Sequence, residues 1–153
     1  MQVGIYAIGR KMPGWVNHAC DDYTRRLPRR WQTTVREFTQ ARGDNSQTIL
    51  SREADALLAA IPEKAHVVML DSSGSQWSTE ELASQLNRWQ QLGRNLIFLV
   101  GGAEGLHVRC GEQANEIWSL SRLTFPHPLA RVILLEQLYR AQSLNDNHPY
   151  HRG

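Results

Sequence analysis

Residues 95–105 read Asn-Leu-Ile-Phe-Leu-Val-Gly-Gly-Ala-Glu-Gly, and this stretch decides the fold that we expect. The continuous apolar run 96–100 is typical of a strand buried on both faces, as in a parallel sheet covered by helices. Gly101, Gly102 and Gly105 then permit a tight turn and a close approach of backbone to a ligand. Ligands of open α/β sheets bind outside the carboxyl ends of the strands. The loop is therefore either a binding loop or a plain turn between a strand and a helix.

The loop lacks the motifs that bind nucleotide phosphates. Its glycines do not follow the G-x-G-x-x-G spacing, and no G-K-[ST] follows as in a P-loop. Glu104 would also repel a phosphate placed beside it. A cationic or neutral ligand suits this loop better, and the missing fingerprint argues against a nucleotide-dependent oxidoreductase.

The rest of the chain alternates between strand-like and helix-like segments. Apolar or alternating runs predict further strands at 1–8, 33–38, 66–70 and 117–120. Helical periodicity predicts helices at 13–26, 46–60, 78–92, 108–115 and 129–143. This alternation predicts one α/β domain over residues 1–153, with a parallel sheet of about five strands and helices on both faces.

Two helices carry more specific signals. Ser78 and Glu81 have the spacing of a capping box, and Gly93 stands where that helix should end. The last helix, 129–143, is apolar nearly all round in its middle. Such a helix needs burial on two sides, so we expect it to pack against the sheet on one side and a second copy of the chain on the other.

Composition excludes several classes of protein. The apolar fraction of 41% and the charged fraction of 21% are those of an ordinary globular protein. No leader opens the chain and no apolar run approaches about 20 residues, so we expect a cytoplasmic protein without a membrane span. Cys20 and Cys110 lack metal-ligand spacing, so no metal site is expected.

Charge is unevenly placed along the chain. Residues 1–42 hold eight basic and three acidic side chains, residues 43–118 hold five and ten, and residues 119–153 hold four and two. This pattern indicates either a polyanion bound by one face or simply solvated helix ends.

Three predicted strands end in loops that should open on the same edge of the sheet. Residues 70–74 supply Asp71 and serines, 101–105 supply bare backbone, and 120–126 supply hydroxyls with Leu123 and Phe125. Apolar walls could hold a flat ring while backbone N–H and C=O groups bind its edges. Such a pocket suits adenine without a phosphate tail.

Seven short segments along the chain form a recognisable series. They are Lys11-Met-Pro13, Leu70-Asp71, Val100-Gly-Gly-Ala-Glu-Gly105, Trp118-Ser-Leu-Ser121, Leu123-Thr-Phe-Pro-His-Pro-Leu129, Leu138-Tyr-Arg140 and Asn147-His-Pro-Tyr-His-Arg152. The two segments with Pro-His-Pro-Leu and Asn-His-Pro-Tyr-His-Arg are specific. In these segments, which run in order along the whole chain, the protein resembles the RlmH family of SPOUT-class methyltransferases.

The resemblance implies a fold, a cofactor and a substrate. The family has a parallel-sheet SPOUT fold with a C-terminal trefoil knot, forms a homodimer and holds S-adenosyl-L-methionine in the knot. It methylates N3 of a pseudouridine in large-subunit ribosomal RNA, on the assembled ribosome. A proline is frequent in the family where this chain has Ala103. The implied cofactor contacts are Leu70, Gly101, Gly102, Ser121, Arg122, Leu123, Thr124, Phe125 and Pro126.

The implied reaction needs a group that removes the N3 proton or a cation that stabilises the ring anion. The candidate proton acceptors are His127, His148, Tyr150 and His151, and the candidate cations are Arg140 and Arg152. Each has a structural alternative. Arg140 could bind carbonyls at the end of its helix, His127 could cap the start of the same helix, and the tail could be disordered.

No separate RNA-binding domain fits into the chain. Arg25, Arg26, Arg29 and Arg30 are therefore candidates for steering RNA phosphates, with ordinary surface charge as the alternative. The competing function is a non-catalytic RNA- or ribosome-binding module that retains the fold.

Overall fold

A computed structural model describes residues 1–152, and Gly153, the last residue of the predicted tail, lies outside the described residues. The strands form one five-stranded sheet in the order β2-β1-β4-β3-β5, with every neighbouring pair parallel. In chain order the elements are β1 (Val3–Ile8), α1 (Gly14–Arg26), η1 (Arg29–Trp31), β2 (Thr34–Phe38), α2 (Ser46–Ala60), β3 (His66–Gln76), α3 (Thr79–Leu92), β4 (Leu96–Val100), α4 (Val108–Gln113), β5 (Glu116–Ser119), α5 (His127–Asn145) and η2 (Pro149–Arg152). The predicted α/β fold with a parallel sheet is confirmed.

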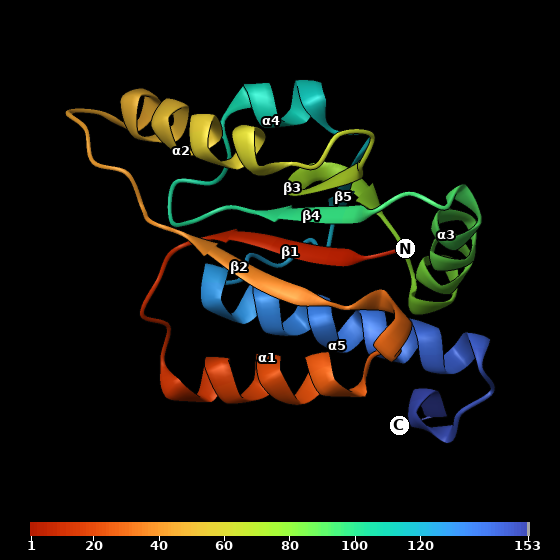
Figure 1. The fold of residues 1–153 in the computed structure, drawn as a ribbon. Coiled ribbons are helices and arrows are strands. Elements are labelled where there is room, and N and C mark those ends of the chain that lie inside the picture. The colour runs from red at the N-terminus through yellow and green to blue at the C-terminus, as the bar shows by residue number, and fades with distance from the viewer. Residues whose placement is uncertain (153) are drawn as a thin grey trace.

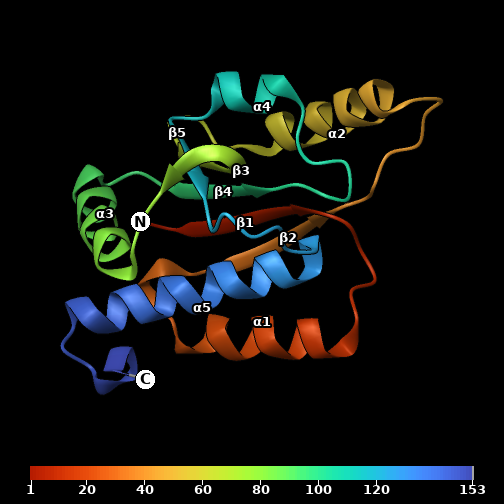
Figure 2. The same cartoon turned by 180° about the vertical axis from the view of Figure 1, so that it is seen from behind.

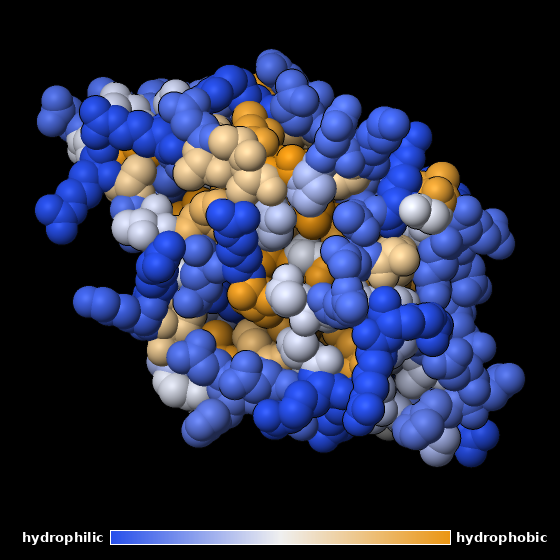
Figure 3. All heavy atoms as spheres, in the orientation of Figure 1, coloured by the Kyte–Doolittle hydropathy of each residue, from blue (hydrophilic) through white to orange (hydrophobic). Residues whose placement is uncertain are grey.

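Helices cover both faces of the sheet (Figures 1 and 2). The central strands β1 and β4 are buried along their whole length, as the continuous apolar run in β4 predicts. Successive side chains alternate between two cores: Ile5 and Phe98 pack with α1, α3 and α5, whereas Leu99 packs with α2 and α4. Hydrophilic residues cover most of the face seen in Figure 3, and apolar residues show chiefly in its middle.

The helix signals read from the sequence are present in the structure. The backbone N–H of Glu81 donates to Ser78 Oγ at 3.1 Å, and the backbone N–H of Ser78 donates to Glu81 Oε2 at 2.7 Å. Gly93 ends α3 in the left-handed conformation with φ of 67°. The capping box and the glycine stop are both confirmed.

The predicted end of the third strand at Leu70 is wrong, since β3 continues to Gln76. Leu70 and Ser75 both pair with Trp118 of β5, so residues 71–74 bulge out between them. Gly74 makes this possible, because a Cβ there would lie 2.5 Å from the backbone carbonyl of Ile117. The predicted loop is therefore an interruption within a strand.

Helix α5 connects two distant parts of the molecule. It begins at His127, two residues before the predicted start, and has 19 residues. At 1.5 Å per residue its length is about 28 Å. It runs along the sheet from the edge where the parallel strands end to the opposite edge, where the tail folds as η2 (Figure 1). No helix among residues 1–152 is long and apolar enough to cross a membrane. The trefoil knot stays a prediction.

Candidate functional site

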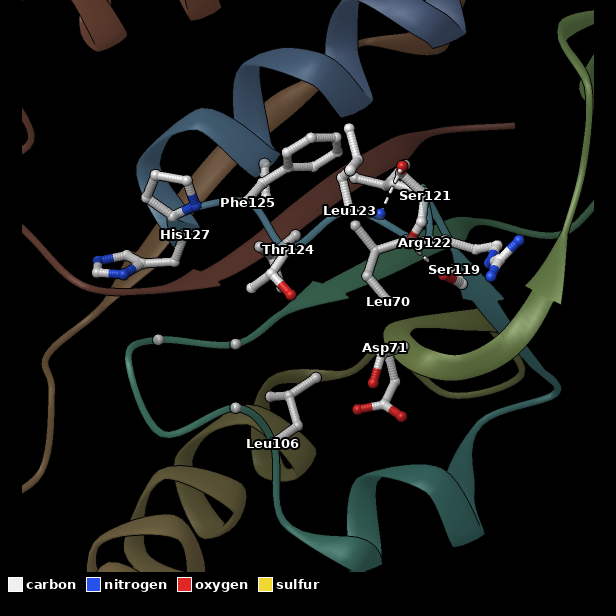
Figure 4. Close-up of a pocket in the computed structure, with 18 of the residues that line it drawn as sticks. Leu70, Asp71, Leu106, Ser119, Ser121, Arg122, Leu123, Thr124, Phe125 and His127 are labelled. Carbon is white, nitrogen blue, oxygen red and sulfur yellow. Dashed lines mark hydrogen bonds between the residues drawn. The ribbon is translucent and has the colours of Figure 1, made fainter.

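A cavity of about 940 Å³ lies at the carboxyl edge of the sheet. Segments from the ends of β3, β4 and β5 and the first turn of α5 surround it (Figure 4). This is the place where open α/β sheets bind ligands, and the size suits a small organic molecule. The residues that line it are Leu70, Asp71, Ser72, Gln76, Val100, Gly101, Gly102, Ala103, Gly105, Leu106, Ser119, Leu120, Ser121, Arg122, Leu123, Thr124, Phe125, Pro126, His127 and Ala130.

All nine predicted cofactor contacts lie around this one cavity. They come from three segments that are separated by up to 50 residues in sequence and meet because parallel strands end at a common edge. The structure thus places them together, while their role as cofactor contacts stays a prediction. They are Leu70, Gly101, Gly102, Ser121, Arg122, Leu123, Thr124, Phe125 and Pro126.

The glycine loop after β4 is folded tightly on itself. The backbone N–H of Gly105 donates to the carbonyl of Gly102 at 3.1 Å. A Cβ at Gly101 would lie 2.7 Å from the backbone of Gly105, so no side chain fits there without moving the loop. Outside the loop, Ser46 Oγ donates to Glu104 Oε2 at 2.9 Å and ties its tip to the start of α2. The loop therefore presents backbone, not side chains, to the cavity.

The loop between β5 and α5 forms the other wall. Ser121 organises it, because Ser121 Oγ accepts from the backbone N–H of Leu123 at 2.9 Å and its carbonyl accepts from Ser119 Oγ at 3.0 Å. The Leu123 side chain is 72% exposed, which is unusual for leucine and leaves an apolar surface beside the opening. Apolar walls also come from Leu70 and Leu106 on the facing side (Figure 4).

His127 stands at the rim of the cavity, in the first turn of α5 (Figure 4). Burial, and after it the charge of nearby Arg131, lower the pKa of the imidazole below its ordinary value of 6.5. The ring is therefore neutral near pH 7 and can accept a proton. Pro126 occupies the N-cap of α5 without a side-chain cap bond, so the alternative role of His127 as the cap is wrong.

A buried ion pair holds the N-terminal part of α5 against the sheet beside the cavity. Arg131 is only 2% exposed, and its guanidinium donates to Glu37 Oε2 at 2.5 Å and to the carbonyl of Gly9 at 3.3 Å. It thereby joins α5 to the ends of β1 and β2. Arg131 and Glu37 were not predicted from the sequence, because a contact across 94 positions leaves no local pattern.

The remaining candidate residues lie at the other end of α5. Arg140 pairs with Glu136 at 2.7 Å, and the Tyr150 hydroxyl lies 3.3 Å from Glu136 Oε1 and 3.1 Å from the Tyr23 hydroxyl. The Tyr150 ring packs against Tyr139 with centroids 4.5 Å apart, and the Arg140 guanidinium stacks over it at 4.9 Å. The predicted alternative of a disordered tail is therefore wrong for residues 149–152, which form η2.

The tail side chains differ in how firmly they are held. Tyr150 is half-buried, and burial, followed by its bond with Tyr23, raises the pKa of its phenol above the usual range. It is therefore a hydrogen-bond donor near neutral pH. His151 Nδ1 contacts the carbonyl of His148, while Arg152 is exposed. Glu136 connects Arg140 and Tyr150 and was not predicted from the sequence. Its i, i+4 spacing from Arg140 was the available signal.

The structure therefore divides the six catalytic candidates between two places. His127 borders the cavity, whereas Arg140 lies further along α5, about 20 Å away, and the others belong to the tail that packs against the C-terminal half of that helix. The distant candidates are Arg140, His148, Tyr150, His151 and Arg152.

Comparisons with known proteins place this geometry in a family. Residues 1–151 match the family described as "Predicted SPOUT methyltransferase". The chain is 50% identical over 155 residues to the ribosomal RNA large subunit methyltransferase H of Methylococcus capsulatus. The alignment covers 99% of this chain and 100% of that relative.

Solved structures with low sequence identity share the fold. A methylase family protein from Haemophilus influenzae Rd KW20 superposes with a TM-score of 0.60 at 11% identity, covering 97% of this chain and 69% of its own. One from Neisseria gonorrhoeae gives 0.58 at 12% identity, covering 90% and 81%. With a family match along nearly its whole length and a relative at 50% identity, this chain belongs to the SPOUT methyltransferases.

Proposed function

We propose that this protein transfers a methyl group from S-adenosyl-L-methionine to N3 of a pseudouridine in large-subunit ribosomal RNA. It acts on the assembled ribosome as a homodimer, and hence in the cytoplasm. The observation that carries the proposal is the 50% identity, over 99% of this chain, to a relative named as a ribosomal RNA large subunit methyltransferase.

The cavity at the carboxyl edge fits the proposed cofactor. Its volume of about 940 Å³ accommodates an adenosyl group and an amino-acid tail, and Leu70, Leu106 and Phe125 offer apolar surface for a ring. Asp71 and Arg122 supply charges of both signs at the lining. That suits a molecule carrying a sulfonium, an ammonium and a carboxylate better than it suits a polyphosphate.

When bound there, S-adenosylmethionine supplies a methyl group on a cationic sulfur. The residues of the chain then have to hold the target ring in line and remove the proton from N3. His127, neutral near pH 7, is suited to accept that proton, and Arg140 or Arg152 is suited to stabilise negative charge on the ring. Tyr150 is better suited to donate a hydrogen bond than to accept the proton, because its phenol stays protonated.

The homodimer would resolve the separation of these residues. Within one protomer η2 packs against Tyr139 in the C-terminal half of α5, whereas the cavity lies at the first turn of that helix. A twofold arrangement can set the tail of each protomer at the cavity of its partner. Leu129, Val132 and Ile133 leave apolar, half-buried surface on α5 for such a contact.

The competing proposal is a non-catalytic module that binds RNA or ribosomes. The decisive experiment incubates the protein with labelled S-adenosylmethionine and ribosomes lacking the methyl group. Transfer to a single pseudouridine, located by primer extension or mass spectrometry, supports the enzyme. Ribosome binding without transfer, together with no shift in melting temperature on adding S-adenosylmethionine, supports the binding module.

A further inference from the structure

A second hollow lies at the tail end of α5, with a volume of about 500 Å³. It is separate from the cofactor cavity and lies between the α1–η1 corner and the residues that follow α5. Hydrophilic residues cover this part of the molecule in Figure 3, at the lower right, where Figure 1 places the end of α1 and η2. The groove is lined by Arg26, Pro28, Arg30, Tyr139, Gln142, Ser143, Asp146, Asn147, His148 and Pro149.

Arg26 and Arg30, both exposed, line one wall of this groove, and the exposed Arg25 and Arg29 directly precede them in sequence at the same corner. Arg26 is paired with Asp22 at 3.1 Å, and Arg30 donates to Gln90 Oε1 at 3.4 Å. The guanidinium groups of Arg25 and Arg29 form no hydrogen bond or ion pair with any of residues 1–152. These two cations are therefore available to a ligand.

The walls of the groove are held in place by interactions within the chain. Gln90 bonds both Arg30 and Gln142, at 3.4 and 3.3 Å, and thereby joins η1, α3 and α5. Gln142 also donates to Asp146 Oδ1 at 3.1 Å, which partly satisfies that carboxylate. The guanidinium of Arg26 lies 5.8 Å from the ring centroid of Tyr139. The groove is thus preformed and carries two arginines in its wall.

We propose that this groove binds the ribose-phosphate backbone of the ribosomal RNA strand beside the target nucleotide. This inference rests on the proposed function. Arg25 and Arg29 contact phosphates, while Asn147 and His148, both exposed, offer hydrogen bonds to ribose hydroxyls. If the tail of one protomer enters the active site of its partner, this groove borders that site and guides the strand toward it.

The chemistry of the groove favours RNA over a second copy of the chain as its occupant. The cores of stable protein interfaces are depleted of charged residues and rich in apolar surface. Here the lining carries Arg26, Arg30, His148 and Asp146, and the unpaired arginines stand beside it. Phosphates complement such a surface, whereas a second copy would bury its charges without compensation.

The test replaces Arg25 and Arg29 by glutamine in the full chain. We expect binding to ribosomes lacking the methyl group, and to a single-stranded RNA oligonucleotide, to weaken about tenfold, about threefold for each exposed ion pair. The slope of log K against log salt should fall by about 0.7 per arginine. KM for ribosomes should rise with kcat unchanged, and the affinity for S-adenosylmethionine and the melting temperature should stay the same.

Two matched variants distinguish phosphate binding from a general charge effect. Arg42→Gln with Lys64→Gln removes the same charge from exposed positions outside the groove and should leave RNA affinity unchanged. Arg25→Lys with Arg29→Lys keeps the charge and should restore most of the affinity.

Three results would overturn the inference. The first is an unchanged affinity and salt slope in the glutamine variant, and the second is an equal loss in the control. The third is dissociation of the dimer in light scattering, which would make the groove a contact between protomers. A wild-type protein that binds the RNA with the expected salt slope but never methylates ribosomes would refute the proposed function and leave the groove assigned to RNA.

Discussion

The two ends of α5 are built in different ways. At its first turn the helix borders an open cavity made largely of loop backbone, where Gly101 and Ser121 shape the walls. In its C-terminal half Glu136, Arg140 and Tyr150 already bond one another, near a smaller groove of about 500 Å³. One end is prepared to receive a molecule, and the other presents preorganised side chains. In the proposed homodimer these two ends would form complementary halves of one site.

Gly101→Val should have the largest effect, because it disrupts the cavity at the first turn of α5 and leaves the tail unchanged. Its Cβ would lie 2.7 Å from the backbone of Gly105 and would force the glycine loop to move. We expect affinity for S-adenosylmethionine, measured by calorimetry, to fall by at least about 100-fold, the cost of a displacement of about 1 Å at such a site. Gly14→Ala is the control, since a Cβ there meets nothing within 4 Å. Unchanged cofactor affinity in Gly101→Val would move the binding site elsewhere.

Arg152→Ala changes the tail and leaves the cavity intact. It should reduce kcat about 100- to 1000-fold, as loss of an electrostatic stabiliser does. Cofactor affinity and melting temperature should not change, because Arg152 is exposed.

Mixing the Arg152→Ala and Gly101→Val proteins then tests whether the cavity of one protomer acts with the tail of its partner. Mixed dimers would contain one intact site, so an equal mixture should recover about a quarter of wild-type turnover. No recovery after subunit exchange would place cavity and tail in the same protomer.

Local sequence patterns predicted most of this architecture. The run 96–100, the Ser78 capping box and the alternation of strands and helices each depend on neighbouring residues, and the structure has them. The extension of β3 beyond Leu70 was missed because Ser75 and Gln76 become strand only through pairing with β5. Propensity alone makes residues 71–74 a turn, and they do bulge out, whereas pairing with β5 makes Ser75 and Gln76 part of the strand.

The cavity was better predicted than the arrangement of the catalytic candidates. Three loops at the carboxyl ends of parallel strands must converge, so the position of the cavity follows from topology. Nothing local indicates that Arg131 pairs with Glu37, or that Tyr150 would fold back onto Tyr23 across 127 positions. Sequence motifs grouped His127 with the tail by chemistry, whereas in the structure His127 lies at the first turn of α5 and the tail packs against the C-terminal half of that helix.

His127→Gln tests whether the group that accepts the N3 proton lies at the cavity or in the tail. If His127 accepts the N3 proton, the variant should lose about 100-fold in kcat, the lower end of the range for general bases. Because the pKa of His127 is lowered, the neutral form persists below pH 6.5, and wild-type activity should fall only in more acidic solution. The acid limb of the profile of kcat against pH should disappear in the variant. An unaltered limb would assign the base to the tail.

Glu116→Gln should have the smallest effect on turnover, since it alters stability at a distance from both ends of α5. Glu116 Oε2 accepts from Trp89 Nε1 at 2.6 Å and lies 2.6 Å from His66 Nε2, and Arg88 pairs with its other oxygen. Burial opposes its ionisation, but these partners outweigh burial and lower its pKa below 4.5. The stabilisation is therefore complete above pH 4.5 and is lost as the pH falls through the lower, folded value.

We expect the Glu116→Gln variant to lose about 2 kcal/mol of unfolding free energy at pH 7 by urea denaturation. The loss should shrink toward zero in acid, while kcat stays unchanged. Glu112→Gln, an exposed carboxylate in the preceding helix, is the control and should be neutral at both pH values. An equal loss from both variants would show that the interaction depends on general charge, not on these three partners.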